Sequence, residues 1–113
     1  MVKSKVTGHS RDLQNIFHAI SDPTRRKILE RLAEKALTVT EIKVPYKMSL
    51  VAVSKHLKVL ERANLIRRQR MGREHVIRLH PHPMREAYHY LEMYKKHWRR
   101  QLDALEKFVE RNG

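Results

Sequence analysis

Cysteine is absent from the 113-residue sequence, glycine occurs three times and proline four times, and aromatic residues make up only 6%. The lack of cysteine excludes a disulfide framework, a thiolate metal site and a thiol nucleophile. No apolar run approaches the roughly 18 residues that a membrane span requires. The polar first residues lack the apolar core of a secretory signal. We therefore expect a single domain in the cytoplasm.

Acidic side chains are also scarce, because 12 Asp and Glu stand against 25 Lys and Arg, which leaves a formal net charge of +13. This imbalance indicates a polyanionic partner, with nucleic acid favoured over an anionic membrane surface. We expect residues 1–10 to form a basic, flexible arm and residues 11–113 to form the folded domain.

Apolar residues recur at helical spacing in the first half of the chain. The first helix face consists of Leu13, Ile16, Phe17 and Ile20. Asp22 and Pro23 then end one helix and start the next, as an N-cap followed by a proline in the first helical position. The stripe predicted on this second helix consists of Ile28, Leu29, Leu32, Ala33 and Ala36.

Two further helix starts follow closely. Thr38 and Glu41 have the spacing of a capping box, which predicts a short third helix that Pro45 limits. Ser49 is a suitable N-cap for a fourth helix that runs to about Ala63. The buried stripe of this helix is predicted to be Leu50, Val53, Leu57 and Leu60.

From residue 65 onward the spacing of apolar residues is that of β-strands rather than of helices. Residues 65–70 and 74–79 are predicted to pair as a hairpin, and Gly72 between them is free to adopt positive φ. A last helix is expected from about Met84 to about Glu110. The order of elements predicts a mainly α (α+β) fold, a winged helix-turn-helix with a two-stranded wing and a long C-terminal dimerisation helix.

The outward face of the fourth helix is short-chained near its start and cationic further on. Its members are Val51, Ser54, Lys55, Lys58 and Arg62. Such a face suits a DNA major groove, although a solvated charged face has the same pattern. The hairpin region decides in favour of nucleic acid, because residues 62–78 contain six arginines and one acid, Glu74. His56 is expected to be half-buried and hydrogen-bonded rather than to read bases.

Three segments resemble one known family. Residues 16–29 are similar to the opening signature of ArsR/SmtB-type transcriptional regulators, residues 52–61 to their recognition helix and residues 65–79 to their wing. The resemblance implies a homodimeric repressor that binds a two-fold symmetric operator and leaves it when an effector arrives. It also implies a DNA-reading face of Ser49, Val51, Ser54, Lys55 and Lys58 and a wing tip of Arg70 and Arg73. With Arg62 and Arg68, these residues are the predicted DNA contacts.

The metal sites of that family have no counterpart at the matching positions. Residues 40–44 contain no thiolate, and the last helix lacks the family's ligand spacing. One alternative set of nitrogen and oxygen ligands remains near the start of the last helix, namely His80, His82, Glu86 and His89. Because these histidines also fit a solvated helix start, we expect no metal and no cofactor, and the effector is unknown.

The last helix carries an apolar seam at heptad spacing that only Lys95 interrupts. A domain of this size is too small to cover a helix of some 27 residues, so we expect a second copy to do so. The predicted interface consists of Leu13, Ile16, Phe17, Tyr88, Leu91, Tyr94, Trp98, Leu102 and Leu105. The alternative is that the seam packs on its own core or ends in a free tail.

The preferred function is therefore a sequence-specific DNA-binding transcriptional regulator. A non-specific nucleic-acid packaging protein and a metal-responsive repressor are the alternatives. An enzyme is not expected, because no nucleophile elbow, phosphate loop or HExxH motif occurs.

Overall fold

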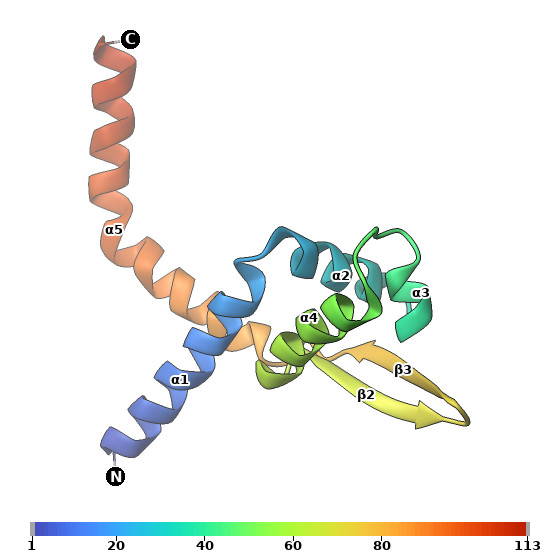
Figure 1. Cartoon of the computed structure of the whole chain (residues 1–113). Coiled ribbons are helices and arrows are strands. Elements are labelled where there is room, and N and C mark those ends of the chain that lie inside the picture. The colour runs from blue at the N-terminus through green and yellow to red at the C-terminus, as the bar shows by residue number, and fades with distance from the viewer. Residues whose placement is uncertain (1, 113) are drawn as a thin grey trace.

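The computed structural model describes the backbone of residues 2–112 and the side chains of residues 11–112. Within this range the elements are α1 (Val2–Ile20), α2 (Pro23–Glu34), β1 (Leu37–Thr38), α3 (Val39–Lys43), α4 (Leu50–Arg62), β2 (Ile66–Met71), β3 (Glu74–Leu79) and α5 (Met84–Asn112). The mainly helical winged helix-turn-helix predicted from the sequence is confirmed (Figure 1). None of the helices in this range has the length and apolar character needed to cross a membrane.

The helices begin where short polar side chains cap them. Asp22 accepts a hydrogen bond from the backbone N–H of Arg25 at 3.0 Å, and Pro23 is the first residue of α2. Ser49 caps α4 by accepting from the N–H of Ala52 at 3.1 Å. Both predicted caps are confirmed, because each side chain satisfies an N–H group that has no partner within its own helix.

The sheet has one strand more than the predicted hairpin. Its order is β1-β3-β2, antiparallel throughout, and the short β1 pairs Leu37 with Ile77. A two-residue segment carries no recognisable period, so only the tertiary structure reveals it. The turn between β2 and β3 contains Gly72 at φ +65°, as predicted, a conformation that residues with a Cβ adopt only at a steric cost.

The core lies where α1, α2, α3 and α4 meet the sheet. The largest fully buried side chains are Ile16, Ile28, Ile42, Val53, Leu57, Leu60, Leu65 and Ile77. Three predictions about the core are wrong. Leu50 is 51% exposed because it is the first residue of α4, at the rim of the domain, and Ala33 is exposed on α2. Ala36 follows the end of α2 at Glu34 and therefore belongs to no helical stripe.

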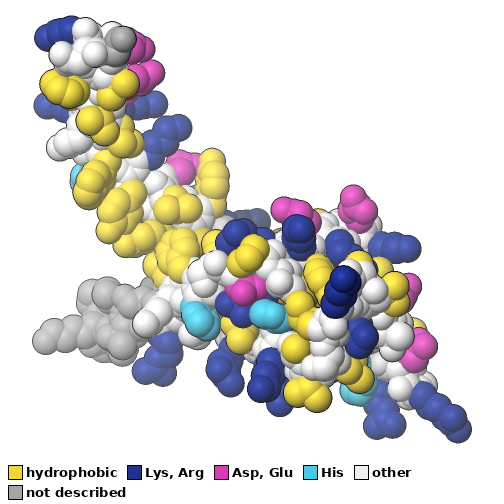
Figure 2. Space-filling view, turned by 45° about the horizontal axis from the view of Figure 1, so that its top comes forward, with side chains coloured by type: hydrophobic (Ala, Val, Ile, Leu, Met, Phe, Trp, Pro, Cys, Tyr) yellow, Lys and Arg dark blue, Asp and Glu magenta, His cyan; other side chains and the backbone are white. Residues whose placement is uncertain are grey.

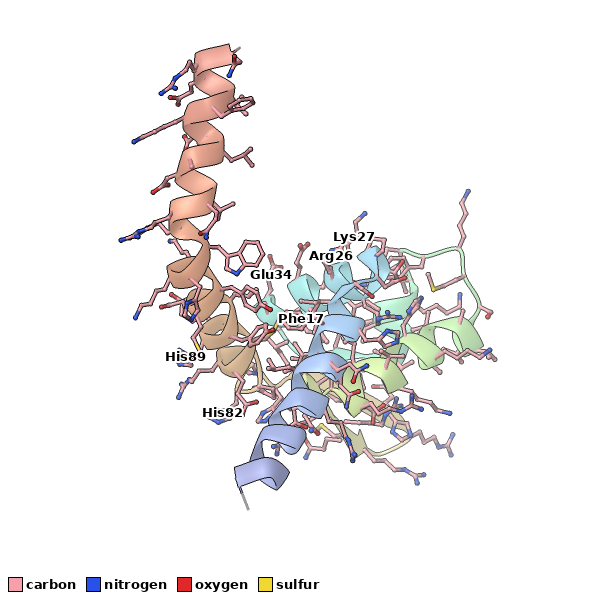
Figure 3. The ribbon with its side chains drawn as sticks, turned by 90° about the vertical axis from the view of Figure 1, so that its left-hand side faces the viewer. Phe17, Arg26, Lys27, Glu34, His82 and His89 are labelled. Carbon is pink, nitrogen blue, oxygen red and sulfur yellow. The ribbon has the colours of Figure 1, made fainter. Side chains whose placement is uncertain are left out.

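The long helix α5 gives the molecule an extended shape. It starts beside α1, where the rings of Phe17 and Tyr90 lie 6.0 Å apart, and its later turns project away from the body (Figures 1 and 3). The radius of gyration is 18.3 Å, against about 13 Å for a compact domain of this length. The distal part of α5 therefore has no packing partner within the described chain.

The backbone of α1 continues through residues 2–10. The side chains of this segment lie outside the described residues, and the flexible arm expected there stays a prediction.

Candidate nucleic-acid interface

Helices α3 and α4 form the helix-turn-helix, and α3 is held at both ends. At its start, Thr38 and Glu41 form the predicted capping box, with hydrogen bonds of 2.8 and 3.1 Å between each side chain and the other's backbone N–H. The bond from the N–H of Thr38 lowers the pKa of Glu41 below its ordinary value. At its end, the guanidinium of Arg31 on α2 donates to the carbonyls of Glu41 and Ile42, both at 2.9 Å. The short helix is thus fixed on α2.

Helix α4 has a buried inner face and an exposed outer face. Val53, Leu57 and Leu60 have no exposed surface and attach the helix to the core. On the outer face Val51 is 66% exposed. The remaining outward side chains are the half-buried Ser54 and the exposed Lys55, Lys58 and Arg62. The structure therefore brings the predicted members of this face together on one side of one helix.

The end of α4 determines where the wing begins. Asn64 has φ 58°, the left-handed conformation that ends many helices. The N–H of Asn64 donates to the carbonyl of Glu61 at 2.9 Å, and the N–H of Leu65 to that of Leu60 at 3.0 Å. These two bonds are those of a Schellman motif, which satisfies the last carbonyls of the helix and turns the chain directly into β2. The wing thus starts from the C-terminal end of α4.

The wing carries its arginines outward. Arg67, Arg68, Arg70, Arg73 and Arg78 are all exposed. The Nε of Arg70 donates to the carbonyl of Gly72 at 3.3 Å, which places this arginine at the tip, as predicted. Arg68 differs from the others, because its guanidinium donates to Glu61 on α4 at 2.8 and 3.3 Å. This ion pair ties the wing to α4, and a DNA phosphate would compete with Glu61 for Arg68.

Two hollows separate α4 from the wing. One of about 670 Å³ is lined by Ser54, Lys58, Glu61, Arg62 and Arg68. The other, of about 260 Å³, lies toward α3 and the wing tip and includes Leu50, Ser54 and Arg73 in its lining. Ser54 belongs to both, so the two hollows adjoin along the outer face of α4. Figure 2 shows Lys and Arg side chains spread around the body of the domain and a continuous row of apolar side chains along α5.

One arginine of α2, which no sequence pattern singled out, is buried. Arg25 is 8% exposed and donates from Nε to the carbonyl of Ala19 at 2.7 Å and from NH2 to that of His18 at 3.1 Å. Its NH1 lies 3.1 Å from Nδ1 of His56 on α4. Because a guanidinium only donates, Nδ1 of His56 is the acceptor. Arg25 thus joins the end of α1, the start of α2 and the recognition helix α4.

The neighbouring carboxylate of Asp22 completes this junction. Its Oδ2 lies 3.9 Å from Nδ1 of His56. Burial raises the pKa of Asp22, but hydrogen bonds from the backbone N–H groups of Arg25 and Thr24 and the charge of Arg25 outweigh it, so the pKa lies below its ordinary value. His56, with 22% of its side chain exposed, is half-buried and hydrogen-bonded, as the sequence analysis predicts. Asp22 and Pro23 predicted a helix start at this point, but neither residue signals the contact between Arg25 and His56.

The predicted dimer residues fall into two groups. On α5 the predicted side chains that are exposed are those of Tyr88, Leu91, Tyr94, Trp98, Leu102 and Leu105, and their role in a dimer stays a prediction. Four aromatic rings form a row from α1 along α5, in the order Phe17, Tyr90, Tyr94 and Trp98, with ring centroids 4.9 to 6.0 Å apart. Leu13 and Phe17 are half-buried. Ile16 is a correction, because it is 1% exposed and belongs to the protomer's own core.

The apolar surface of α5 includes residues that the heptad spacing did not predict. Met93 and Phe108 are also exposed, at 60% and 63%. Both lie off the heptad seam, which is why a strict 4-3 spacing does not include them. The exposed apolar surface of α5 is therefore wider than the heptad seam alone.

The alternative metal ligands do not converge. Among the described side chains, no group of three or more His, Asp or Glu lies close enough to hold a metal ion. Nε2 of His80 lies 3.2 Å from NH2 of Arg67, and burial and the charge of Arg67 lower the pKa of His80. The ring of His89 packs edge-on against Tyr88, and Figure 3 shows His89 on α5 above His82, which precedes this helix.

The geometry defines the class of protein as a winged helix-turn-helix, and comparison with known proteins agrees. Residues 20–69 match the model of a helix-turn-helix domain family. The transcriptional repressor SdpR of Bacillus subtilis is 42% identical over 60 residues, which cover 53% of this chain and 67% of the repressor. The HTH-type transcriptional regulator Rv2034 of Mycobacterium tuberculosis is 34% identical over 97 residues, 86% of this chain and 88% of that protein.

Solved structures show the same likeness over most of the fold. The crystal structure of an ArsR family transcriptional regulator, RHA00566, superposes with a TM-score of 0.76 at 32% identity, over 80% of this chain and 93% of that one. The chain belongs to the ArsR family of winged helix-turn-helix transcriptional regulators, and it is a DNA-binding regulator of transcription.

Proposed function

We propose that this regulator is a homodimeric repressor that binds a two-fold symmetric operator and acts in the cytoplasm without any enzymatic activity. The observation that carries the dimer is the exposed apolar face of α5. It extends from Tyr88 to Val109 on a helix that projects from the body (Figure 2). Monomeric proteins rarely expose a continuous apolar face of this length, whereas a second copy would bury it.

Two copies related by a two-fold axis present two α4 helices to the same duplex. Recognition helices in such dimers contact half-sites about one helical turn apart, which calls for a two-fold symmetric operator. The proposal of repression rests on the likeness to SdpR, which is named as a transcriptional repressor.

The proposed DNA contacts are Ser49, Val51, Ser54, Lys55, Lys58 and Arg62 of α4 and its N-cap, with Arg68, Arg70 and Arg73 of the wing. The side chain of Ser49 caps α4, so its contact with DNA would use the remaining capacity of the same hydroxyl. If each protomer neutralises about four phosphates, the dimer neutralises about eight. The logarithm of its DNA affinity should then fall with a slope of about −7 against the logarithm of the salt concentration.

The dimer is tested by sedimentation equilibrium and DNase footprinting with the pair of substitutions Leu102→Glu and Leu105→Glu. The wild-type protein is expected to sediment as a dimer and to protect both halves of a palindrome. The double variant is expected to be monomeric, to keep its helical circular dichroism and to bind the operator about 100-fold more weakly, since the two half-sites are no longer linked. A monomeric wild type with full operator affinity contradicts the dimer.

The reading face is tested separately. Lys55→Ala combined with Ser54→Ala should abolish the footprint while the protein stays folded and dimeric. A competitor of scrambled sequence distinguishes the regulator from a packaging protein, because equal displacement by any duplex favours the latter.

A further inference from the structure

The first turn of α4 exposes apolar side chains in the middle of a cationic surface. Val51 is 66% exposed and Leu50 is 51% exposed. Lys55, Lys58 and Arg62 follow on the same helix. At the wing tip, Arg73 lines the same hollow as Leu50, and Arg70 lies beside Gly72. Neither Val51 nor Leu50 is near the apolar face of α5 that the proposed dimer covers. The described residues therefore leave about two thirds of Val51 and half of Leu50 open to solvent.

The position of Val51 on α4 places it in the centre of the outward face. At 100° per residue, Val51 lies within about 60° of both Ser54 and Lys58. Leu50 points instead toward the hollow between α4, α3 and the wing. Since recognition helices contact base edges with their N-terminal residues, Val51 is the side chain best placed to reach a base.

The chemistry of this turn excludes the common polar readouts. Guanine is usually recognised by a bidentate Arg or Lys and adenine by a bidentate Asn or Gln. The first turn of α4, residues 50–53, contains none of these residues, and the first long polar side chain on the helix is that of Lys55. The apolar group that a DNA major groove offers is the C5-methyl of thymine.

We propose that Val51 reads a thymine methyl group and that each half-site of the operator therefore contains an A·T pair at the position facing the first turn of α4. The inference rests on the proposed operator binding and adds the base and the side chain that recognise each other. Ser54, one turn further along, lies next to this contact and has a hydroxyl that serves either a donor or an acceptor on the neighbouring base.

The test removes the methyl group without changing base pairing. Duplexes are first selected from a random pool with the wild-type protein, and each thymine of the bound sequence is then replaced by deoxyuridine, one at a time. Loss of one buried methyl group is expected to weaken binding about fourfold at one thymine in each half-site. The other replacements are expected to have smaller effects.

Two variants show whether Val51 is responsible. Val51→Ala should bind the thymine duplex more weakly and should no longer distinguish it from the deoxyuridine duplex. Val44→Ala is the matched control, because Val44 is a valine that is 76% exposed but lies at the end of α3 rather than on α4. This control should keep the fourfold difference. Since both valines are exposed, neither truncation is expected to unfold the protein.

The outcomes separate this inference from the proposed function. If selection yields a two-fold sequence but no deoxyuridine weakens binding, operator binding stands and the methyl readout is overturned. The readout is also overturned if Val51→Ala keeps the full sensitivity to deoxyuridine. If selection yields no sequence at all and scrambled duplexes compete equally, the sequence-specific function itself fails.

Discussion

Helices α4 and α5 have similar amphipathic patterns, but the apolar stripe of α4 is buried and that of α5 is exposed. In α4 the apolar stripe of Val53, Leu57 and Leu60 is completely buried. In α5, by contrast, Leu91 and Trp98 are 54% and 53% exposed. The α4 stripe meets α1, α2 and the sheet, while the distal part of α5 projects beyond every other element. A periodic apolar stripe thus predicts a helix face that packs against another element. Whether an element of the same protomer can cover that face depends on how far the helix extends beyond the body of the domain.

The largest effect is expected from Leu57→Ala in α4. The side chain has no exposed surface, so truncation leaves a cavity and should lower the free energy of unfolding by about 2–5 kcal/mol. Urea unfolding followed by circular dichroism measures this loss. A variant as stable as the wild type would mean that the stripe of α4 is not closely packed.

Arg25→Ala should be the next most destabilising change. It removes hydrogen bonds to the carbonyls of His18 and Ala19 and to the ring of His56, so we expect a loss of about 2–4 kcal/mol. Arg25→Lys is the control and should restore only part of the stability, because an ammonium lacks the planar fork that reaches three acceptors. Full recovery with lysine would show that charge rather than geometry matters here.

Asp22→Asn tests the electrostatic part of the same junction. The pKa of Asp22 lies below its ordinary value of 3.8, so the carboxylate stabilises the fold above that pH, and its contribution is lost as the pH falls through the lowered pKa. Asparagine can still cap α2, so the cost at neutral pH should be at most about 0.5–2 kcal/mol. The acid-induced loss of stability should be shallower in the variant, and an unchanged pH profile between pH 5 and pH 2 would assign the effect to other groups.

Leu102→Ala is the matched counterpart of the leucine substitution in α4. Leu102 is 54% exposed in the protomer, so its truncation should change the stability of the dilute protein by no more than about 0.5 kcal/mol. In the wild type the unfolding midpoint should rise with protein concentration, because association stabilises the folded state, and the variant should show a smaller rise. A loss as large as that of Leu57→Ala, independent of concentration, would mean that Leu102 packs within its own protomer.

Local signals in the sequence predicted most of the fold. The caps at Asp22, Thr38 and Ser49 depend on side chains that bond to backbone groups two or three residues away, so position along the chain is enough to recognise them. The positive φ of Gly72 and the alternation of the hairpin are equally local. The outward members of α4 follow from helix periodicity and the buried stripe on the other side.

The features that the sequence analysis missed depend on distant partners. Strand β1 exists because Leu37 pairs with Ile77, forty residues later, and two residues show no period of their own. Arg25 has the same local pattern as its exposed neighbour Arg26, and its burial depends on carbonyls of α1 and on His56. Ile16 shares a helix face with Phe17, yet only the packing of α1 decides that Ile16 faces the core.

The sequence by itself therefore determined the order and type of the main elements, the cationic character of the surface and the residues that share each helix face, because these depend on neighbours within a few positions. Only the tertiary structure decided which apolar side chains the protomer buries and which it leaves exposed. Through Arg25 it linked α2 to α1 and α4, it tied Arg68 to Glu61, and it left Val51 and the later turns of α5 exposed. Burial depends on contacts between residues far apart in the chain, and the spacing of residues along one helix does not contain that information.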